Sequence, residues 1–345
     1  MPADPEIPCP PLGARSTVYR WSDLPEPVRE WWARAGRAAN TVQQTLGHAD
    51  AVAAALGSNC VHVAVHCGLL SAFRQHEDRA SCVFAGRPIL GGPPDSRLRE
   101  LAELVRTALG APVVYFPHVT SAAASGLVSW RRRDSPTVTW TEQGRDLPER
   151  VRRRYGSRAD RQWRRFQAAG LTTAPASGTA AVAVLDTIER RSWKAMCGQS
   201  MHDRDQQFEL YSGLLDRNLV TLDVAWHGRR PVAYRLDARM GRTVACVKWS
   251  FDEAYRRSSP GFYLLTEGLV RRWGPVELDL IDLFGGPDTL KDMVASGAVP
   301  RYDLAWPPGS AADELRAERS AFDHAARDNH TASRGVRHLY QGSIA

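Results

Sequence analysis

Apolar and polar positions along the chain predict the same order of elements twice. In the second half, the periodicities indicate helices at 180–197 and 205–217, strands at 219–226, 231–238 and 242–251, a helix at 259–273, a strand at 276–283 and a short helix carrying Lys291. The first half shows a looser version, with strands at 60–70 and 80–89, a Gly-rich turn at 91–94, a helix at 96–109 and a strand at 113–116. We therefore predict an α/β (α+β) fold made of two duplicated halves.

Prolines, glycines and charge place the boundaries of these halves. Residues 1–16 contain five prolines and are expected to form a flexible arm. We assign 17–150 to the first half, 151–310 to the second half, and 311–345 to a charged helix with a polar tail. A basic helical stretch at 147–169, which Gly170 can end, joins the halves.

The positive charge is concentrated in that joining helix. The formal net charge is +7, and residues 145–165 contribute nine arginines against three carboxylates, a balance of +6. Arg154, Arg158, Arg161 and Arg165 recur at three- to four-residue spacing, so on one helix they share a face. Such a stripe suits the phosphate backbone of a tRNA, although clustered arginines can also be a merely solvated face.

Lysine is rare, and its positions are informative. Lys194, Lys248 and Lys291 are the only lysines, beside 42 arginines. A coding bias explains the shortage, and the three lysines are then candidates for positions that need a compact amine with an adjustable pKa.

The remaining composition argues against several classes of protein. The six cysteines show no zinc-like spacing, so we predict no metal site. No apolar run approaches the roughly 20 residues needed to span a membrane, and no signal peptide is apparent. We expect a cytoplasmic protein without a membrane partner.

A turn between a strand and a helix is the best candidate for binding an anion. The strand at 242–251 ends before Tyr255, and the helix begins near Pro260. Helix N-termini attract phosphate, and two arginines stand beside this one. The predicted anion or substrate site comprises Arg256, Arg257, Ser258, Ser259 and Gly261, with Trp193 and Lys194 from upstream.

The order of elements and four motifs carry a resemblance to a known family. The motifs are Trp193-Lys194, the run from Lys248 through Asp252-Glu253 to Tyr255, Ser259-Pro260-Gly261, and Asp282 followed by Lys291. The chain resembles the Fem-type and cellulose-biosynthesis-type branch of the Gcn5-related (GNAT) acyltransferase superfamily, which includes relatives of the valanimycin-pathway seryl transferase. The resemblance implies two fused GNAT-like halves, the first degenerate, with mixed, mostly antiparallel sheets and a cleft between the halves.

Members of this branch often transfer an amino acid from aminoacyl-tRNA to an amine. The superfamily's coenzyme A turn needs Gly and Gly/Ala where this chain has Pro260 and Phe262; proline has no N–H to donate. We therefore expect an aminoacyl-tRNA-dependent aminoacyltransferase that needs no cofactor and acts on a small amine or hydroxylamine. The alternatives are an acyl-CoA-dependent N-acyltransferase and a catalytically silent protein that binds RNA or a protein partner.

Within that hypothesis, three residues are candidates for catalysis. Lys291 would contact the oxyanion or a ribose phosphate, unless it is a solvated surface lysine. Asp282, near the end of an apolar strand, would be the general base, although a base-free reaction through the substrate's own hydroxyl stays open. Lys248 would either contact a phosphate or form a buried ion pair with Glu189 or Asp252.

Overall fold

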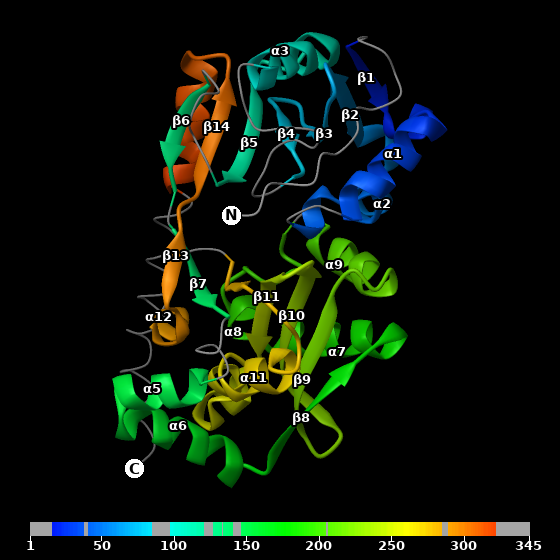
Figure 1. Cartoon of the computed structure of the whole chain (residues 1–345). Helices are drawn as coiled ribbons and strands as arrows, with labels where there is room; N and C mark the ends of the chain where they lie inside the picture. The colour runs from blue at the N-terminus through cyan, green and yellow to red at the C-terminus, as the bar shows by residue number, and fades with distance from the viewer. Residues whose placement is uncertain are drawn as a thin grey trace.

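Two seven-stranded sheets, one in each half, organise the molecule (Figure 1). The computed structural model describes residues 16–37, 41–84, 97–120, 127–132, 134–140, 146–204, 206–284 and 289–321. The predicted N-terminal arm lies almost wholly outside these residues, as does the polar tail.

The first sheet has the order β1-β2-β3-β4-β5-β14-β6 and the second β13-β7-β12-β11-β10-β9-β8. The first sheet contains β1 (Thr17–Arg20), β2 (Val61–His66), β3 (Leu69–Gln75), β4 (Ala80–Cys82), β5 (Val114–Val119), β14 (Tyr302–Trp306) and β6 (Val128–Arg131). The second sheet contains β13 (Gly297–Val299), β7 (Ser135–Thr139), β12 (Leu280–Asp282), β11 (Thr243–Phe251), β10 (Arg230–Met240), β9 (Thr221–His227) and β8 (Leu171–Ala176).

Helices cover both sheets. They are α1 (Glu26–Arg37), α2 (Leu46–Leu56), α3 (Arg97–Leu109), α5 (Leu147–Tyr155), α6 (Ser157–Ala168), α7 (Gly178–Arg191), α8 (Trp193–Met196), α9 (Gln207–Asp216), α10 (Pro260–Leu264), α11 (Glu267–Trp273) and α12 (Thr289–Val294), with a further helix over 310–321. Short 3-10 helices are η1 (Trp21–Asp23), η2 (Val42–Gln44), η3 (Ser58–Cys60) and η4 (Glu253–Ser258). None of the described helices is long and apolar enough to cross a membrane.

The two sheets repeat one topology, which confirms the predicted duplication. β1 to β5 and β8 to β12 follow the same order, and in each set only the last two strands pair in parallel, β4 with β5 and β11 with β12. The helices repeat as well: α1, α2 and α3 in the first half correspond in order to α7, α9 and α10–α11 in the second. α2 and α9 pack on each other between the halves, where Ala51 approaches Gly213 closely.

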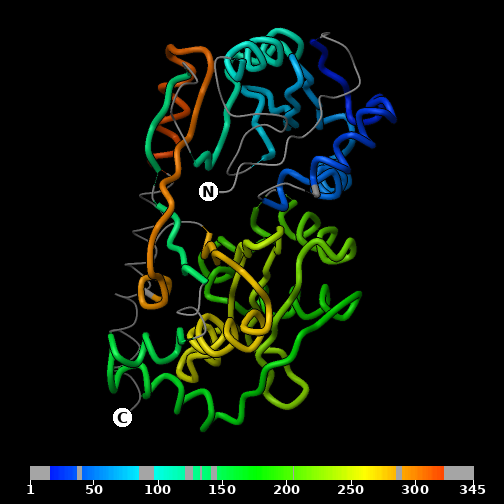
Figure 2. Tube along the Cα trace, viewed as in Figure 1, coloured from blue at the N-terminus to red at the C-terminus, as the bar shows by residue number. Residues whose placement is uncertain are grey.

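Each half also contributes one strand to the sheet of the other. β14 inserts between β5 and β6, and β7 inserts between β12 and β13 (Figure 2). The short connections at 132–134 and 300–301 therefore each lead from one sheet into the other. The sheets therefore do not divide the chain at the predicted boundaries of 150 and 310.

Two predicted helices are each broken in two. The stretch 147–169 forms α5 and α6 because Gly156 adopts a positive φ of 50° between them. The stretch 259–273 forms α10 and α11, interrupted at Leu265 and Thr266. The break at Gly156 corrects the predicted arginine stripe, since Arg154 now belongs to a different helix from Arg158, Arg161 and Arg165.

Alternation along β10 separates the two faces of the second sheet. Tyr234 and Leu236 join the apolar cluster that includes α7 and α9. Arg235, fully buried, faces the other way, where it pairs with Asp223 and Asp237 and donates to a carbonyl of α10. Alternate side chains of β10 therefore face different helices: one set faces α7 and α9, and the other faces α10.

Candidate functional site

The second sheet opens on one side of β11. β11 pairs with β12 only over Thr243–Ala245, opposite Leu280–Asp282, and then continues to Phe251 without another described strand on that side. α8 lies at this free end, where Lys194 donates a hydrogen bond to the carbonyl of Trp249 (2.5 Å). Trp193, half-buried, begins the same helix.

A cluster of charged and polar groups lies beside the free end, and we call it the lysine cluster: Glu189, Lys194, Gln207, Tyr234 and Lys248. Lys248 pairs in register with Leu236 of β10, so its side chain lies on the face covered by α7 and α9. Its Nζ donates to Oε1 of Gln207 in α9 at 3.0 Å.

Glu189 is the buried anion of the lysine cluster. Its side chain accepts hydrogen bonds from the Tyr234 hydroxyl (2.5 Å) and the Met201 backbone N–H (2.8 Å), and the residue has no exposed surface. Burial raises the pKa of Glu189, but the charges of Lys194 and Lys248 outweigh burial and hold the pKa below its usual value.

Lys248 is a lysine that can lose its proton near neutral pH. Burial first, and then the charge of Lys194, lower the pKa of Lys248 to about 7 against the opposing charge of Glu189. The sequence analysis considered Glu189 and Asp252 as ion-pair partners of Lys248, and Glu189 is the one whose charge acts on Lys248. Asp252 instead bonds Arg230 (2.7 Å) and the Ala254 N–H.

The predicted anion turn is filled by contacts within the protein. Arg256 forms an ion pair with Glu253, and the Ser259 hydroxyl donates to Gln162 of α6. Gly261 lies under Trp249, whose ring would be 2.8 Å from a Cβ at that position. Arg257 is exposed, and Ser258 is partly buried in η4.

Asp282 and Lys291 meet at Phe284. The Asp282 carboxylate accepts from the Ser135 hydroxyl (2.5 Å) and the Phe284 N–H (2.9 Å) and pairs with Arg301, so it is fully engaged. Lys291 donates to the Phe284 carbonyl and is only 8% exposed, which contradicts its reading as a surface lysine.

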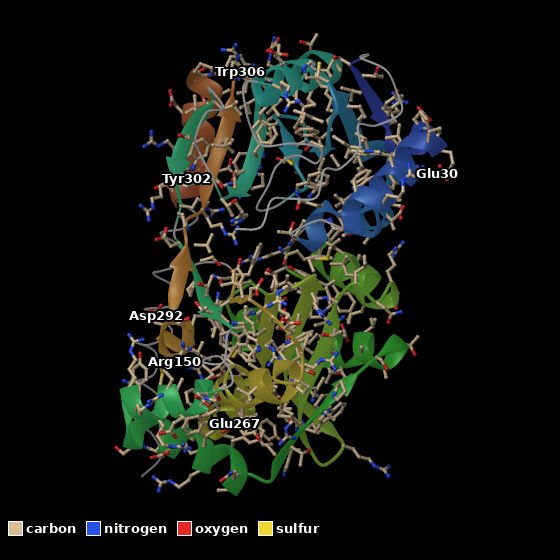
Figure 3. The ribbon with its side chains drawn as sticks, in the orientation of Figure 1. Glu30, Arg150, Glu267, Asp292, Tyr302 and Trp306 are labelled. Atoms are coloured by element: carbon tan, nitrogen blue, oxygen red, sulfur yellow. The ribbon has the colours of Figure 1, made fainter. Side chains whose placement is uncertain are left out.

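The helix that carries Lys291 is held against α5. Arg150 donates to the Val294 carbonyl (2.6 Å), and the Tyr155 hydroxyl donates to the Asp292 carbonyl (3.4 Å). Arg150 and Asp292 accordingly lie side by side in Figure 3.

Arg158, Arg161 and Arg165 line one exposed stripe of α6, opposite its buried residues Ala159, Trp163 and Phe166. Within the described residues, no carboxylate forms an ion pair with any of these three arginines, so their charges face solvent uncompensated.

Comparison with known proteins agrees with this geometry. Residues 150–292 match a family model described as "Acetyltransferase (GNAT) domain". This part of the second half is therefore similar to GNAT acetyltransferase domains. No curated protein matches the sequence.

Solved structures show the same fold over both halves. A conserved protein of unknown function from Bacteroides thetaiotaomicron VPI-5482 is 11% identical, with a TM-score of 0.56 over 80% of this chain and 96% of its own. The C-terminal DUF2156 domain of a protein assigned as a lysylphosphatidylglycerol synthetase from Agrobacterium fabrum is 12% identical, with a TM-score of 0.56 over 84% and 94%. FemX is 9% identical, with a TM-score of 0.54 over 83% and 98%.

The sequence analysis missed three residues whose side chains form hydrogen bonds in the lysine cluster or with the Ser259 motif. Gln207 and Tyr234 complete the lysine cluster, and Gln162 bonds Ser259 across the α6–α10 contact. Only the alternation along β10 marked Tyr234 as inward-facing, and no pattern singled out either glutamine.

Proposed function

We propose that the protein is an aminoacyl-tRNA-dependent aminoacyltransferase that moves an amino acid from charged tRNA to a small amine or hydroxylamine. The observation that carries this proposal is the closed turn before α10. A pyrophosphate held there would need free backbone N–H groups and room for close approach, yet Pro260 has no N–H and the Trp249 ring lies against the Cα of Gly261. α6 packs over the same turn through Gln162 and Ser259.

Two further observations support a tRNA donor. The uncompensated arginines of α6 suit a phosphate backbone, whose binding releases counterions. The fold similarity to FemX agrees with the Fem-type motifs around Lys194, Lys248 and Lys291.

The lysine cluster supplies the proton chemistry in this proposal. The acceptor amine attacks the ester carbonyl of the aminoacyl group, and a tetrahedral intermediate forms. Lys248, with a pKa of about 7, takes the proton that the amine loses and returns it to the ribose oxygen as the ester bond breaks. The products are an amide and an uncharged tRNA, so atoms and protons balance.

The test is transfer from a panel of charged tRNAs to small amines and hydroxylamines, followed by mass spectrometry. We expect product with at least one tRNA, and none when Lys248→Arg replaces the base with a permanently charged group. Lys248→Arg should bind tRNA as the unchanged protein does, because it keeps the positive charge. No transfer with any charged tRNA and acceptor would refute the proposal.

An acyl-CoA-dependent N-acyltransferase is the second candidate, and the acetyltransferase description of the matching family model favours it. Calorimetric titration with coenzyme A separates the two. The closed turn predicts no heat of binding, whereas micromolar affinity would favour the second candidate.

A further inference from the structure

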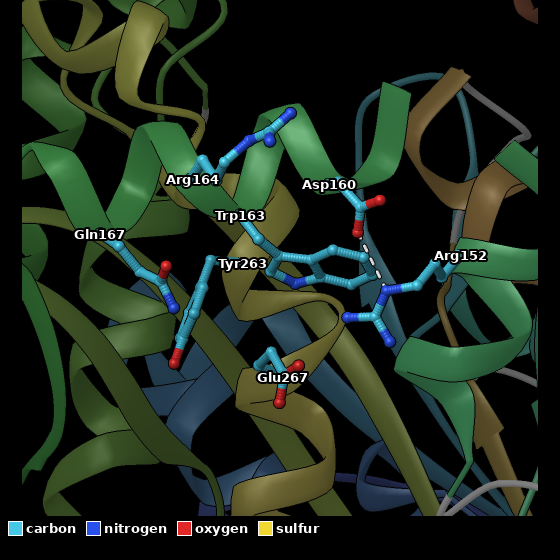
Figure 4. A pocket seen from close by; sticks show the side chains of 7 residues that line it. All are labelled: Arg152, Asp160, Trp163, Arg164, Gln167, Tyr263 and Glu267. Carbon is cyan, nitrogen blue, oxygen red and sulfur yellow. Dashed lines mark hydrogen bonds and ion pairs between the residues drawn. The ribbon is translucent and has the colours of Figure 1, made fainter. Parts of the chain in front are cut away.

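A pocket of about 480 Å³ opens between α6 and the helices that follow the closed turn (Figure 4). Its size falls within the range of small-molecule sites, roughly 300–1,000 Å³. Trp163 and Tyr263 supply its aromatic wall. Trp163 is fixed by its hydrogen bond to Thr266 Oγ1 (3.3 Å), and Tyr263 by stacking on Phe166 at 3.7 Å.

Polar groups surround that aromatic wall. Arg152 and Asp160 on one side of the pocket bond each other at 2.9 Å. Glu267, Gln167 and Arg164 line the pocket too, and among the described residues none of these three side chains has a hydrogen-bond or ion-pair partner. The pocket thus offers a free carboxylate, a free amide and a free guanidinium next to two aromatic rings.

This combination matches the parts of a nucleotide. Aromatic side chains stack on bases, a carboxylate accepts hydrogen bonds from ribose hydroxyls, and a guanidinium binds phosphate. The stripe of Arg158, Arg161 and Arg165 lies on the same helix, α6, so charges for neighbouring phosphates stand close to the pocket. A polyanion of several nucleotides fits this surface better than a single free nucleotide does.

We propose that this pocket binds one nucleotide of a single-stranded RNA end, with the base against Tyr263 and Trp163 and the ribose hydroxyls on Glu267. The proposal rests on the proposed function, since it names the part of the tRNA that α6 and α10 would hold. Neither the closed turn nor the lysine cluster contributes a residue to the pocket.

The test is binding of a fluorescein-labelled RNA hexanucleotide ending in CCA, measured by anisotropy, beside DNA of the same sequence. Because base stacking is worth about 1–3 kcal/mol, Tyr263→Ala should weaken RNA binding by roughly 5- to 150-fold. Glu267→Gln should remove the preference for RNA over DNA, because the 2′-hydroxyl loses its strongest acceptor. Glu209→Gln, on an exposed position of α9, makes the same charge change elsewhere and should leave both affinities unchanged.

Three outcomes decide the proposal. RNA affinity that is unchanged in both Tyr263→Ala and Glu267→Gln would overturn it. Binding of adenosine 3′,5′-bisphosphate that depends on these residues, without binding of the hexanucleotide, would overturn it in favour of a free nucleotide. RNA binding that depends on Tyr263, in a protein that transfers no amino acid, would retain the pocket and refute the proposed function alone.

Discussion

The exposed arginines of α6 lead to a prediction about salt dependence. The perturbation is Arg158→Gln, Arg161→Gln and Arg165→Gln together, which removes three charges that have no ion-pair partner among the described residues. If these side chains contact tRNA phosphates, each contact releases counterions, and the triple variant must lose that part of the salt dependence.

The magnitude follows from the number of charges. Each neutralised phosphate contributes about 0.7 to 0.9 to the slope of log K against log salt, so three contribute about 2 to 3. Between about 50 and 200 mM salt, a fourfold rise, the unchanged protein should therefore lose roughly 20- to 40-fold more affinity than the triple variant.

The assay is filter binding of bulk tRNA across that salt range. The matched control changes Arg106, Arg131 and Arg190 to glutamine. Each of these three arginines pairs with a carboxylate three or four residues away in sequence. The control variant loses the same number of positive charges. Its slope of log K against log salt should differ from that of the unchanged protein by less than about 1. Equal slopes for the two triple variants would refute the assignment of α6 as the tRNA surface.

Three further predictions concern other parts of the molecule. The Glu189 carboxylate raises the pKa of Lys248, so Glu189→Gln should lower that pKa further and move the acidic limb of a kcat/KM–pH profile to lower pH. An acidic limb that does not move would exclude Lys248 as the base. Burial lowers the pKa of His48 from 6.5 to about 4, so the unfolded chain takes up its proton first as pH falls below 6.5, and about 3 kcal/mol of stability should be lost by pH 4. Urea unfolding should show that loss reduced in His48→Gln, and the same pH dependence in both proteins would contradict it. Gly261→Ala places a Cβ 2.8 Å from the Trp249 ring and should cost about 1–3 kcal/mol in thermal unfolding, whereas an unchanged Tm would mean that this contact is absent.

The strands of the second half were predictable because local pattern alone defines them. The strands predicted at 219–226, 231–238 and 242–251 are β9, β10 and β11, with ends shifted by at most two residues. Gly228 and Gly241, both at positive φ, make the turns that separate these strands. By contrast, the strand predicted at 276–283 is only β12 (Leu280–Asp282), and β13 and β14 were missed, because strands of three to five residues carry little periodicity.

The sequence predicted the motif residues of the candidate site but not the contacts that these residues make. Lys194 and Lys248 both lie beside the free end of β11 and act on the same carboxylate, Glu189, a shared partner that the motifs did not predict. The closing of the anion turn depends on Gln162 reaching Ser259, 97 residues away in sequence, and on Trp249 lying over Gly261. Contacts between residues so far apart leave no periodic signal in a single sequence. The sequence therefore could not show whether the predicted anion site is open to a ligand or occupied by the protein's own side chains.

The exchanged strands imply that residues 150–292, which match the family model, do not form an independent unit. His118, near the end of β5, and Phe284, just after β12, are both at positive φ, and their rings lie 5.9 Å apart between the halves. Each is anchored through its backbone N–H by an aspartate, His118 by Asp303 and Phe284 by Asp282. Asp282 is in turn held by Arg301, which lies on the connection leading into the first sheet. A fragment limited to 150–292 would lack β7, β13 and Arg301, and would expose the edge of β12 beside Lys291. The position of Lys291 therefore depends on residues of both halves, since Ser135 and β7 of the first half hold Asp282 and β12.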